Sequence, residues 1–291
     1  MIFVTGASGN VGREVIKCLK KLKADYRIGV RTGEKSKSNK NIVIFDFLDR
    51  KTFGAAVEGC TSVFLLRPPA ISNTKATLNL FIDAARRSGV QHFVFVSVAG
   101  AATNPLVPHH AVEKHLMGGP ADWTILRPGF FAQNLGDAYR IDICNDNRLY
   151  LPAGSARVAF IDARDIAAVA GMALTNPSQH RAKAYLLTGP EALSFSEVAS
   201  ILTNTLGRRI IYQHASIIGY MAHLSTRKMP MLQILIQTVL HVGLRFGQAR
   251  SVDPTLGLLL KRKPYTVADY ARANQTLWNN LNTQRGDKDI P

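Results

Sequence analysis

The first twelve residues read MIFVTGASGNVG, a short apolar run followed at once by three glycines at positions 6, 9 and 12. The run predicts a β-strand over Ile2 to Thr5, and the spacing of apolar residues predicts a helix over Val11 to Leu22. Gly6 permits the tight turn, Gly9 lets the backbone approach a pyrophosphate, and Gly12 permits close packing of helix on strand. The helix N-terminus adds N–H groups and a partial positive charge. We therefore expect a dinucleotide cofactor here, with a purely structural glycine turn as the alternative. The expected contacts are Gly6, Ala7, Ser8, Gly9, Asn10, Val11 and Gly12.

The rest of the first half repeats this alternation of strand-like and helical segments, which is typical of a parallel sheet with crossover helices. Further strands are expected at Tyr26–Val30, Ile42–Phe45, Ser62–Leu66, His92–Ser97 and Trp123–Leu126, and further helices at Thr52–Val57 and Thr74–Ser88. The predicted fold class is α/β: a Rossmann-type, doubly wound parallel sheet with a smaller C-terminal α/β substrate domain.

The second half is less regular but carries several boundary signals. Short strands are expected at Leu149–Gly154, Arg157–Ile161 and Ala184–Leu187, and a helix to about Leu174 with Asp165 as its N-cap. Ser194 and Glu197 form a capping box for a helix that should end at Gly207. We expect residues 1–150 to form the cofactor domain, its sheet completed by residues 157–188. Residues 189–291 should form the smaller, mostly helical substrate-side domain, to which part of the 128–155 stretch also belongs.

The end of the second strand decides between NAD and NADP, because an acidic residue there binds the ribose hydroxyl whereas a basic one meets a 2′-phosphate. This chain has Arg31 there, with Lys35 in the following loop and no acid at the strand end. These cations favour NADP(H) over NAD(H), although they can also be read as solvated loop residues, and Glu34 weakens the local field.

Composition narrows the class of protein further. The 291 residues carry a formal net charge of +16 and only three cysteines, which lie far apart without the spacing of a zinc site or a disulfide framework, so no metal is expected. There is no signal-peptide pattern and no apolar run long enough for a membrane span, which favours a cytoplasmic protein. Met229–Leu244 is an apolar helical stretch, more typical of a core helix or a homodimer helix than of a membrane anchor. The basic surface lacks a recognisable nucleic-acid module.

The residues also resemble the NmrA-like branch of the atypical short-chain dehydrogenase/reductases, which includes bacterial quinone oxidoreductases. The resemblance covers nearly the whole chain. It is carried by Thr5–Gly9, Val63–Leu66, Phe95–Ser97, Glu113, Thr124–Pro128, Gln133–Asn134, Leu187–Glu191 and Lys263–Thr266 with Asp269 and Tyr270. It implies that Asp46 and the neighbouring Phe47 lie near the adenine, and that the Leu66–Arg67–Pro68 turn lies near the adenosine ribose. The alternative for Asp46 is a loop or cap carboxylate.

The candidate catalytic residues depart from the usual pattern. Ordinary short-chain reductases use a serine after the fifth strand and a Tyr-x-x-x-Lys pair on the next helix. Here Ser97 stands after that strand and His110 and Lys114 stand where the pair belongs, so the tyrosine is missing. His110 can donate a proton near neutral pH, and Lys114 also matches the ribose-binding lysine. The alternative is that His109, His110 and His115 have no catalytic role and are helix-entry and surface residues.

A missing tyrosine matters less for a quinone than for a ketone, because hydride transfer to a quinone leaves a far more stable anion. Positioning in a water-poor cleft then suffices, and Phe130, Phe131 and Asn134 are candidate substrate residues, or else ordinary core residues. Three functions remain open: a reductase acting on a quinone or similar small acceptor, a redox sensor that binds NADP without turnover, and nucleic-acid binding by the basic surface.

Overall fold

The computed structural model describes residues 1–31 and 41–279, which divide into two compact units. The first unit comprises residues 1–129, 163–187 and 255–262, and the second comprises residues 130–162, 188–254 and 263 onward.

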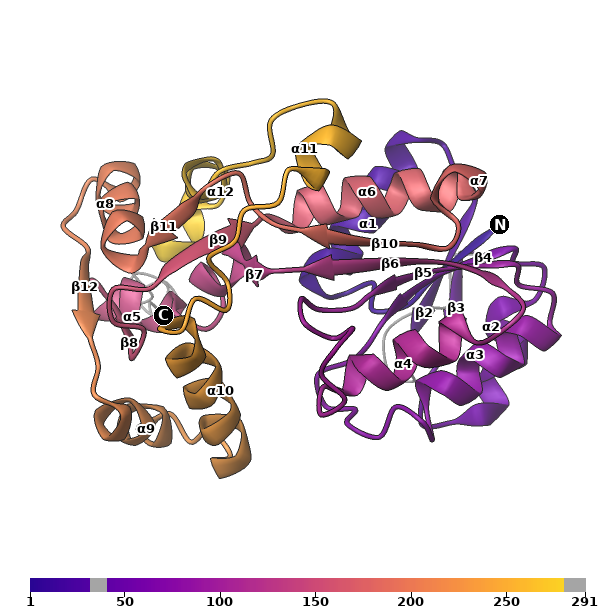
Figure 1. Cartoon of the computed structure of the whole chain (residues 1–291), viewed down its shortest axis with the longest axis horizontal. Helices are drawn as coiled ribbons and strands as arrows, with labels where there is room; N and C mark the ends of the chain where they lie inside the picture. Colours follow the sequence, from indigo (N-terminus) through magenta and orange to yellow (C-terminus); the bar gives the residue numbers. More distant parts are fainter. Residues whose placement is uncertain (32–40, 280–291) are drawn as a thin grey trace, which may run out of the picture. The chain divides into compact units, whose positions relative to one another are not determined.

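The first unit is an α/β layer structure built on a sheet of seven parallel strands in the order β10-β6-β5-β4-β1-β2-β3. Helices α1 and α6 cover one face, and α2, α3 and α4 cover the other (Figure 1). Its strands are β1 (Ile2–Val4), β2 (Tyr26–Val30), β3 (Ile42–Ile44), β4 (Ser62–Leu66), β5 (His92–Val96), β6 (Asp122–Pro128) and β10 (Lys183–Leu187). Its helices are α1 (Asn10–Lys21), the 3₁₀ helix η1 (Arg50–Thr52), α2 (Phe53–Val57), α3 (Leu78–Arg87), α4 (Pro108–Met117), α6 (Ala163–Thr175), α7 (Pro177–His180) and α11 (Thr255–Leu260).

The strand order runs outward in both directions from β1, which confirms the doubly wound Rossmann-type fold. Such sheets bind ligands where the order reverses, outside the carboxyl ends of the central strands. The reversal lies between β1 and β4, which pair in register from Ile2 opposite Ser62 to Val4 opposite Phe64. The glycine loop leaves the sheet at this point.

The second unit has its own core and two small sheets, β11-β9-β7 and β12-β8. Its strands are β7 (Phe130–Phe131), β8 (Arg148–Leu151), β9 (Arg157–Ile161), β11 (Ala192–Ser194) and β12 (Ile211–His214). Its helices are η2 (Ala132–Leu135), α5 (Arg140–Asn145), α8 (Phe195–Leu206), α9 (Ile217–Thr226), α10 (Met231–Leu244), α12 (Val267–Ala273) and η3 (Gln275–Trp278).

The division of the chain differs from the predicted boundaries. All of residues 130–150, and not only part of the 128–155 stretch, belong to the second unit, because Leu135, Tyr139 and Leu149 are buried in its core. β9 pairs with β7 and β11 and so does not extend the main sheet, whereas β10 does complete it. The later segment 255–262 returns to the first unit.

Two helix starts also differ from prediction. α3 begins at Leu78 and not at Thr74, because Asn73 accepts bonds from Ala76 N–H and the Thr77 hydroxyl in a preceding turn. Asp165 lies within the first turn of α6 and is not its N-cap; its buried carboxylate pairs with Arg262 at 2.6 Å. The capping box of Ser194 and Glu197 and the left-handed Gly207 at the end of α8 are confirmed.

Candidate functional site

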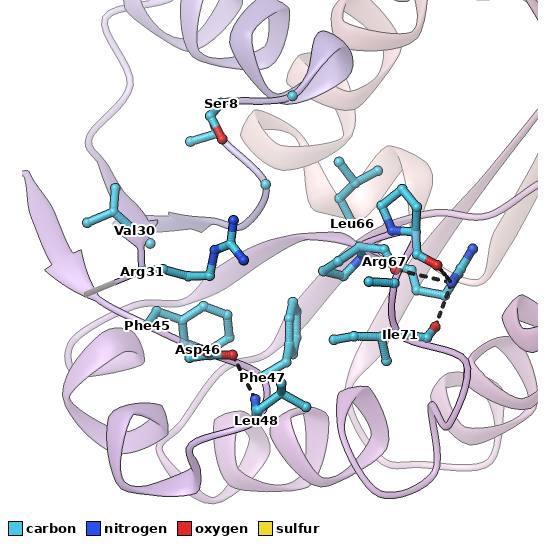
Figure 2. A pocket seen from close by; sticks show the side chains of 17 residues that line it. Ser8, Val30, Arg31, Phe45, Asp46, Phe47, Leu48, Leu66, Arg67 and Ile71 are labelled. Carbon is cyan, nitrogen blue, oxygen red and sulfur yellow. Dashed lines mark hydrogen bonds between the residues drawn. The ribbon is translucent and has the colours of Figure 1, made fainter. Parts of the chain in front are cut away.

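A cavity of about 420 Å³ opens where β1, β2, β3 and β4 end, at the reversal of the sheet order. Figure 2 shows its lining, which the glycine loop, the ends of β2 and β3 and the turn after β4 supply. Ten of the predicted cofactor residues line it: Gly6, Ala7, Ser8, Gly9, Arg31, Asp46, Phe47, Leu66, Arg67 and Pro68.

Other predicted residues lie elsewhere. Asn10, Val11 and Gly12 begin α1 behind the loop, and neither Ser97 nor Lys114 is part of the cavity wall. Lys35 lies outside the described residues. Pro69, which the sequence suggested as a cleft wall, also lines the cavity, but sequence reasoning missed Gly29, Val30, Phe45, Leu48, Ala70 and Ile71. Most of them directly adjoin predicted positions, so the ends of the strands were the available signal.

The glycine loop has no room for side chains. Gly6 has a φ of +64°, and a Cβ there would lie 2.7 Å from the Leu66 side chain. A Cβ on Gly12 would lie 2.0 Å from the carbonyl oxygen of Gly6, so α1 packs directly against the loop backbone. Gly9 N–H donates to the Gly6 carbonyl at 3.0 Å and closes the turn. The loop is therefore a tight backbone cradle, in which the glycines allow close packing against Leu66 and of α1 on the loop itself.

Thr5 fixes this cradle to the neighbouring strand. Its buried hydroxyl donates to the Phe64 carbonyl at 3.1 Å and accepts from the Leu66 N–H at 2.8 Å. Gly9 is the N-cap of α1 and supplies no side-chain cap, and the first turn contains no acid. Among the described residues, neither the N-cap nor the first turn of α1 supplies an acid to the N-terminal end of the helix dipole, which suits an anionic phosphate.

Arg31 places a positive charge at the cavity. It follows β2, is exposed, and its side chain reaches into the space between Ser8 and Asp46 (Figure 2). Asp46 accepts the Leu48 N–H at 2.9 Å and thereby shapes the loop after β3. Beyond Arg31 the wall is largely apolar, with Phe45, Phe47 and Ile71, which suits a planar base.

Arg67 lines the cavity but its guanidinium serves the backbone. Nη1 donates to the carbonyls of Pro68, Pro69 and Ile71 at 3.1, 3.3 and 2.5 Å, and Nε donates to His109 Nε2 at 3.3 Å. Burial lowers the pKa of Arg67. Burial, and then the charge of Arg67, lowers the pKa of His109 to about 4, so His109 is neutral at physiological pH. Arg67 therefore holds the 68–71 wall in shape.

The predicted catalytic residues are placed differently from one another. Ser97 is buried and its hydroxyl donates to Glu113 at 2.5 Å, while Glu113 also pairs with Arg127 at 2.7 Å. His110 bonds the Ala101 carbonyl through Nδ1 at 2.7 Å, which leaves Nε2 as its second nitrogen. Lys114 is exposed one helical turn further on α4. The sequence pointed to Glu113 and Arg127 as part of the family pattern. It did not indicate that the two form an ion pair, or that Glu113 accepts a hydrogen bond from the Ser97 hydroxyl.

The predicted substrate residues belong to the second unit. Phe130 packs edge-on against Phe160, with ring centroids 5.3 Å apart, and near Phe195 and His241. Phe131 and Asn134 follow in β7 and η2 and are partly exposed. Among the described residues, no three metal-ligating side chains lie together. No helix within residues 1–31 and 41–279 has the length and apolar content needed to cross a membrane.

These features fit a dinucleotide. The Gly6–Gly9 loop lines the cavity at the start of α1, the helix end and Arg31 offer positive charge to phosphates, and the apolar wall accepts a base. A nicotinamide dinucleotide bound at such a site would supply the hydride chemistry.

Comparison with known proteins agrees with this geometry. An NAD(P)H azoreductase from Xenophilus azovorans is 36% identical over 220 residues, which cover 73% of this chain and 76% of that protein. Agroclavine dehydrogenase from Claviceps fusiformis is 29% identical and covers 95% of this chain and 98% of its own length. The crystal structure of an NADPH-dependent quinone oxidoreductase from Escherichia coli with NADPH superposes with a TM-score of 0.84. Its identity is 25%, over 96% of this chain and 100% of that one.

A negative transcriptional regulator solved with NAD shares the fold, with a TM-score of 0.75 at 16% identity over 97% of each chain. The family model that matches this sequence is that of the NmrA-like family, over residues 1–270. The chain therefore belongs to the NmrA-like family.

Proposed function

We propose that this protein is an NADP(H)-dependent oxidoreductase that transfers hydride to a quinone or a similar small acceptor, at a cytoplasmic location. The observation that carries the proposal is the cavity at the reversal of the sheet, where the glycine loop and Arg31 face the same space. The similarity to an NAD(P)H azoreductase and to a quinone oxidoreductase solved with NADPH supports the reaction class.

In this proposal each wall of the cavity has one task. The Gly6–Gly9 loop and the N-terminus of α1 bind the pyrophosphate through backbone N–H groups. Arg31 binds the 2′-phosphate, which distinguishes NADP from NAD. Phe45, Phe47 and Ile71 exclude water around the adenine, and Arg67 keeps the Pro68–Ile71 wall in place.

The chemical step asks little of the protein. A reduced quinone is a stable anion, so orientation of the acceptor and exclusion of water supply most of the rate. We assign Lys114 to the cofactor ribose. We assign His110, in its imidazolium form, to late protonation through Nε2, because Nδ1 already donates its hydrogen to the Ala101 carbonyl. Ser97 acts by positioning, since its hydroxyl is donated to Glu113. Phe130, Phe131 and Asn134 are the proposed acceptor contacts.

A second function, an NADP-binding sensor without turnover, is favoured by one specific observation. The serine of the usual triad is buried and bonded to Glu113, and the tyrosine is absent. Such a protein would keep the cofactor cavity and lose the chemistry.

The test is calorimetric titration with NADPH and with NADH, followed in the same sample by cofactor oxidation with a panel of simple quinones. We expect NADPH to bind more tightly, and oxidation to depend on the quinone. Arg31→Gln should weaken NADPH binding by roughly tenfold or more, because a charge-assisted hydrogen bond is lost. It should leave NADH binding nearly unchanged. Lys114→Met should lower turnover.

Arg87→Gln is the matched control, because Arg87 is an exposed arginine outside the cavity wall. Binding of NADPH without any oxidation would favour the sensor. Absence of binding by either nucleotide would remove both functions, and equal loss of NADPH and NADH affinity in Arg31→Gln would remove the assigned preference.

A further inference from the structure

One stretch of the second unit has an unusual charge balance. Residues 198–252 contain no aspartate or glutamate, although the chain has 20 such residues in total. The same stretch contains six cations: Arg208, Arg209, Arg227, Lys228, Arg245 and Arg250. A segment with this balance attracts anionic partners and repels another copy of itself.

Within this stretch, α10 exposes an apolar surface. The helix Met231–Leu244 contains no charged side chain, and its exposed residues follow helical spacing. Leu232 and Val239 are each 69% exposed, whereas Ile234 and Leu244 on the other side are buried in the core of the second unit. We name the exposed set the α10 apolar face: Met231, Leu232, Leu235, Ile236, Val239 and Leu240.

Neighbouring elements enlarge this surface. α9 packs beside α10 (Figure 1) and exposes Ile217 and Ile218, the latter 81% exposed. Phe246, also 81% exposed, follows the C-terminal end of α10. Exposed apolar residues in such number on one helix mark an interaction surface, since isolated ones are ordinary on a protein surface.

A basic cavity of about 590 Å³ lies at the same end of α10. Arg157, His214, Arg245 and Arg250 line it, together with Phe246. Arg157 pairs with Glu197 at 2.9 Å, and Arg245 donates through Nε to the Pro152 carbonyl at 2.7 Å and lies against His214. Arg250 makes no side-chain bond to another described residue. The lining itself contains no carboxylate, so the cavity suits a phosphate or another compact anion.

We propose that the α10 apolar face and the basic cavity together dock on an anionic phospholipid membrane. The apolar face would enter the interfacial layer in the plane of the membrane, and Arg245 and Arg250 would receive lipid phosphates beside the inserted Phe246. α10 has 14 residues, fewer than the roughly 20 that a membrane-spanning helix needs, so it lies on the membrane without crossing it.

Charge complementarity favours this occupant over a second copy of the chain. A symmetric dimer through α10 would bring two acid-free, cationic segments together, on two molecules of formal charge +16 each. Arg227 is already paired with Asp142 at 2.5 Å, and an anionic lipid surface offers the opposite sign to Arg245 and Arg250 at the end of α10.

The experiment is co-sedimentation of the full chain with vesicles of phosphatidylcholine, alone and mixed with phosphatidylglycerol. We expect binding to the mixed vesicles, at least about tenfold weaker binding to phosphatidylcholine alone, and loss on addition of salt. Arg250→Gln should weaken binding about fivefold, because one cation near the surface is removed. The double variant Leu232→Gln/Val239→Gln should weaken it by about tenfold or more.

Matched controls are Arg87→Gln and Leu106→Gln, two exposed positions in the first unit. Both should bind vesicles like the parent, and circular dichroism verifies that every variant is folded. Equal binding to both kinds of vesicle, no binding, or a loss shared by the controls would overturn the proposal. A second copy of the chain would instead be the occupant if three results came together. The parent would be a dimer in analytical ultracentrifugation, the double variant would be a monomer, and vesicles would bind neither protein. That outcome would also overturn the proposal.

Discussion

At the scale of single residues, the glycine loop beside the cavity depends on two positions that lack a Cβ atom, Gly6 and Gly12. The lack of a Cβ at Gly12 lets the first turn of α1 rest on the carbonyl of Gly6, and the lack of one at Gly6 leaves space for Leu66. The pattern of glycines after a strand predicted this loop correctly. It placed the contact of Gly12 on the strand, however, whereas the structure places it on the loop backbone.

Gly12→Ala should therefore destabilise the protein and its cofactor site together. The new Cβ would lie 2.0 Å from a backbone oxygen, which no rotamer change can relieve. We expect a loss of about 1–3 kcal/mol in the free energy of unfolding. We also expect NADPH affinity to fall at least about tenfold, because the cradle must open. Urea unfolding and calorimetry measure the two effects.

Gly54→Ala is the matched control, because Gly54 is in helix α2 and a Cβ there meets nothing within 4 Å. It should raise stability by about 0.5–1 kcal/mol, since alanine is the better helix former. If Gly12→Ala behaved like Gly54→Ala, close packing of α1 on the loop would not limit the site.

Residue contacts across the sequence were harder to predict than the loop. Glu113, Arg127 and Ser97 come from one helix and two strand ends, and only the folded sheet brings them within 2.5–3.1 Å. Arg67 was expected at the cofactor and does line the cavity, but the sequence did not indicate that its guanidinium donates to three carbonyls of its own turn. A motif identifies residue types, but long-range packing decides what each side chain bonds.

At the scale of elements, local signals were reliable where the chain itself provides the partner. The capping box of α8 is one such signal: Glu197 N–H donates to the Ser194 hydroxyl at 3.2 Å, and the Glu197 carboxylate accepts the Ser194 N–H at 2.7 Å. The close packing of α6 on α1 had no local signal. A Cβ on Gly171 would lie 2.5 Å from Cys18 Sγ, in an element more than a hundred residues away.

Ser194→Ala tests the capping box. Loss of the cap should cost about 1 kcal/mol in the free energy of unfolding. Ser200→Ala, an exposed serine within the same helix, should be neutral or slightly stabilising. The bonds from Ser194, and then the one from Arg157, lower the pKa of Glu197 to about 2. The contribution of Glu197 is thus complete above its ordinary pKa and is lost as the pH falls toward about 2.

The cost of Ser194→Ala should accordingly shrink when unfolding is measured at acid pH, where Glu197 becomes protonated. Urea titrations of both serine variants across that range provide the measurement. An equal cost at every pH would mean that the serine and the glutamate stabilise α8 independently.

At the scale of the whole molecule, the class of fold was predictable and the assignment of segments was not. Alternating strands and helices fix a parallel sheet, because crossover helices must cover both faces. The sequence assigned part of the 128–155 stretch to the smaller domain, but nothing in it indicated that all of residues 130–162 leave the first unit or that residues 255–262 return to it. Tyr139 and Leu149 pack with Phe195 in the core of the second unit. The buried Asp165 pairs with Arg262, and both residues belong to the first unit.

Buried histidines in both units make the whole molecule sensitive to acid. Burial lowers the pKa of His92 and His109 in the first unit and of His241 in the second to about 4. The unfolded chain binds these protons near pH 6.5, whereas the folded chain does not until about pH 4. Stability should therefore be complete above about pH 6.5 and fall as the pH drops to about 4, by about 3 kcal/mol for each histidine.

Fluorescence separates the two units in this test, because the chain has two tryptophans and one lies in each: Trp123 in β6 and Trp278 in η3. In a variant that keeps only Trp123, urea unfolding should show the pH dependence of the first unit. Adding His92→Phe should reduce that dependence by about half, because His109 remains. The neutral-pH stability of that variant will also change, because His92 bonds Thr124 at 2.9 Å. The slope against pH, and not the stability itself, therefore carries the test. An unchanged slope of stability against pH would mean that other groups of the first unit bind the protons. If a variant that keeps only Trp278 showed the same reduction on adding His92→Phe, the two units would unfold as one.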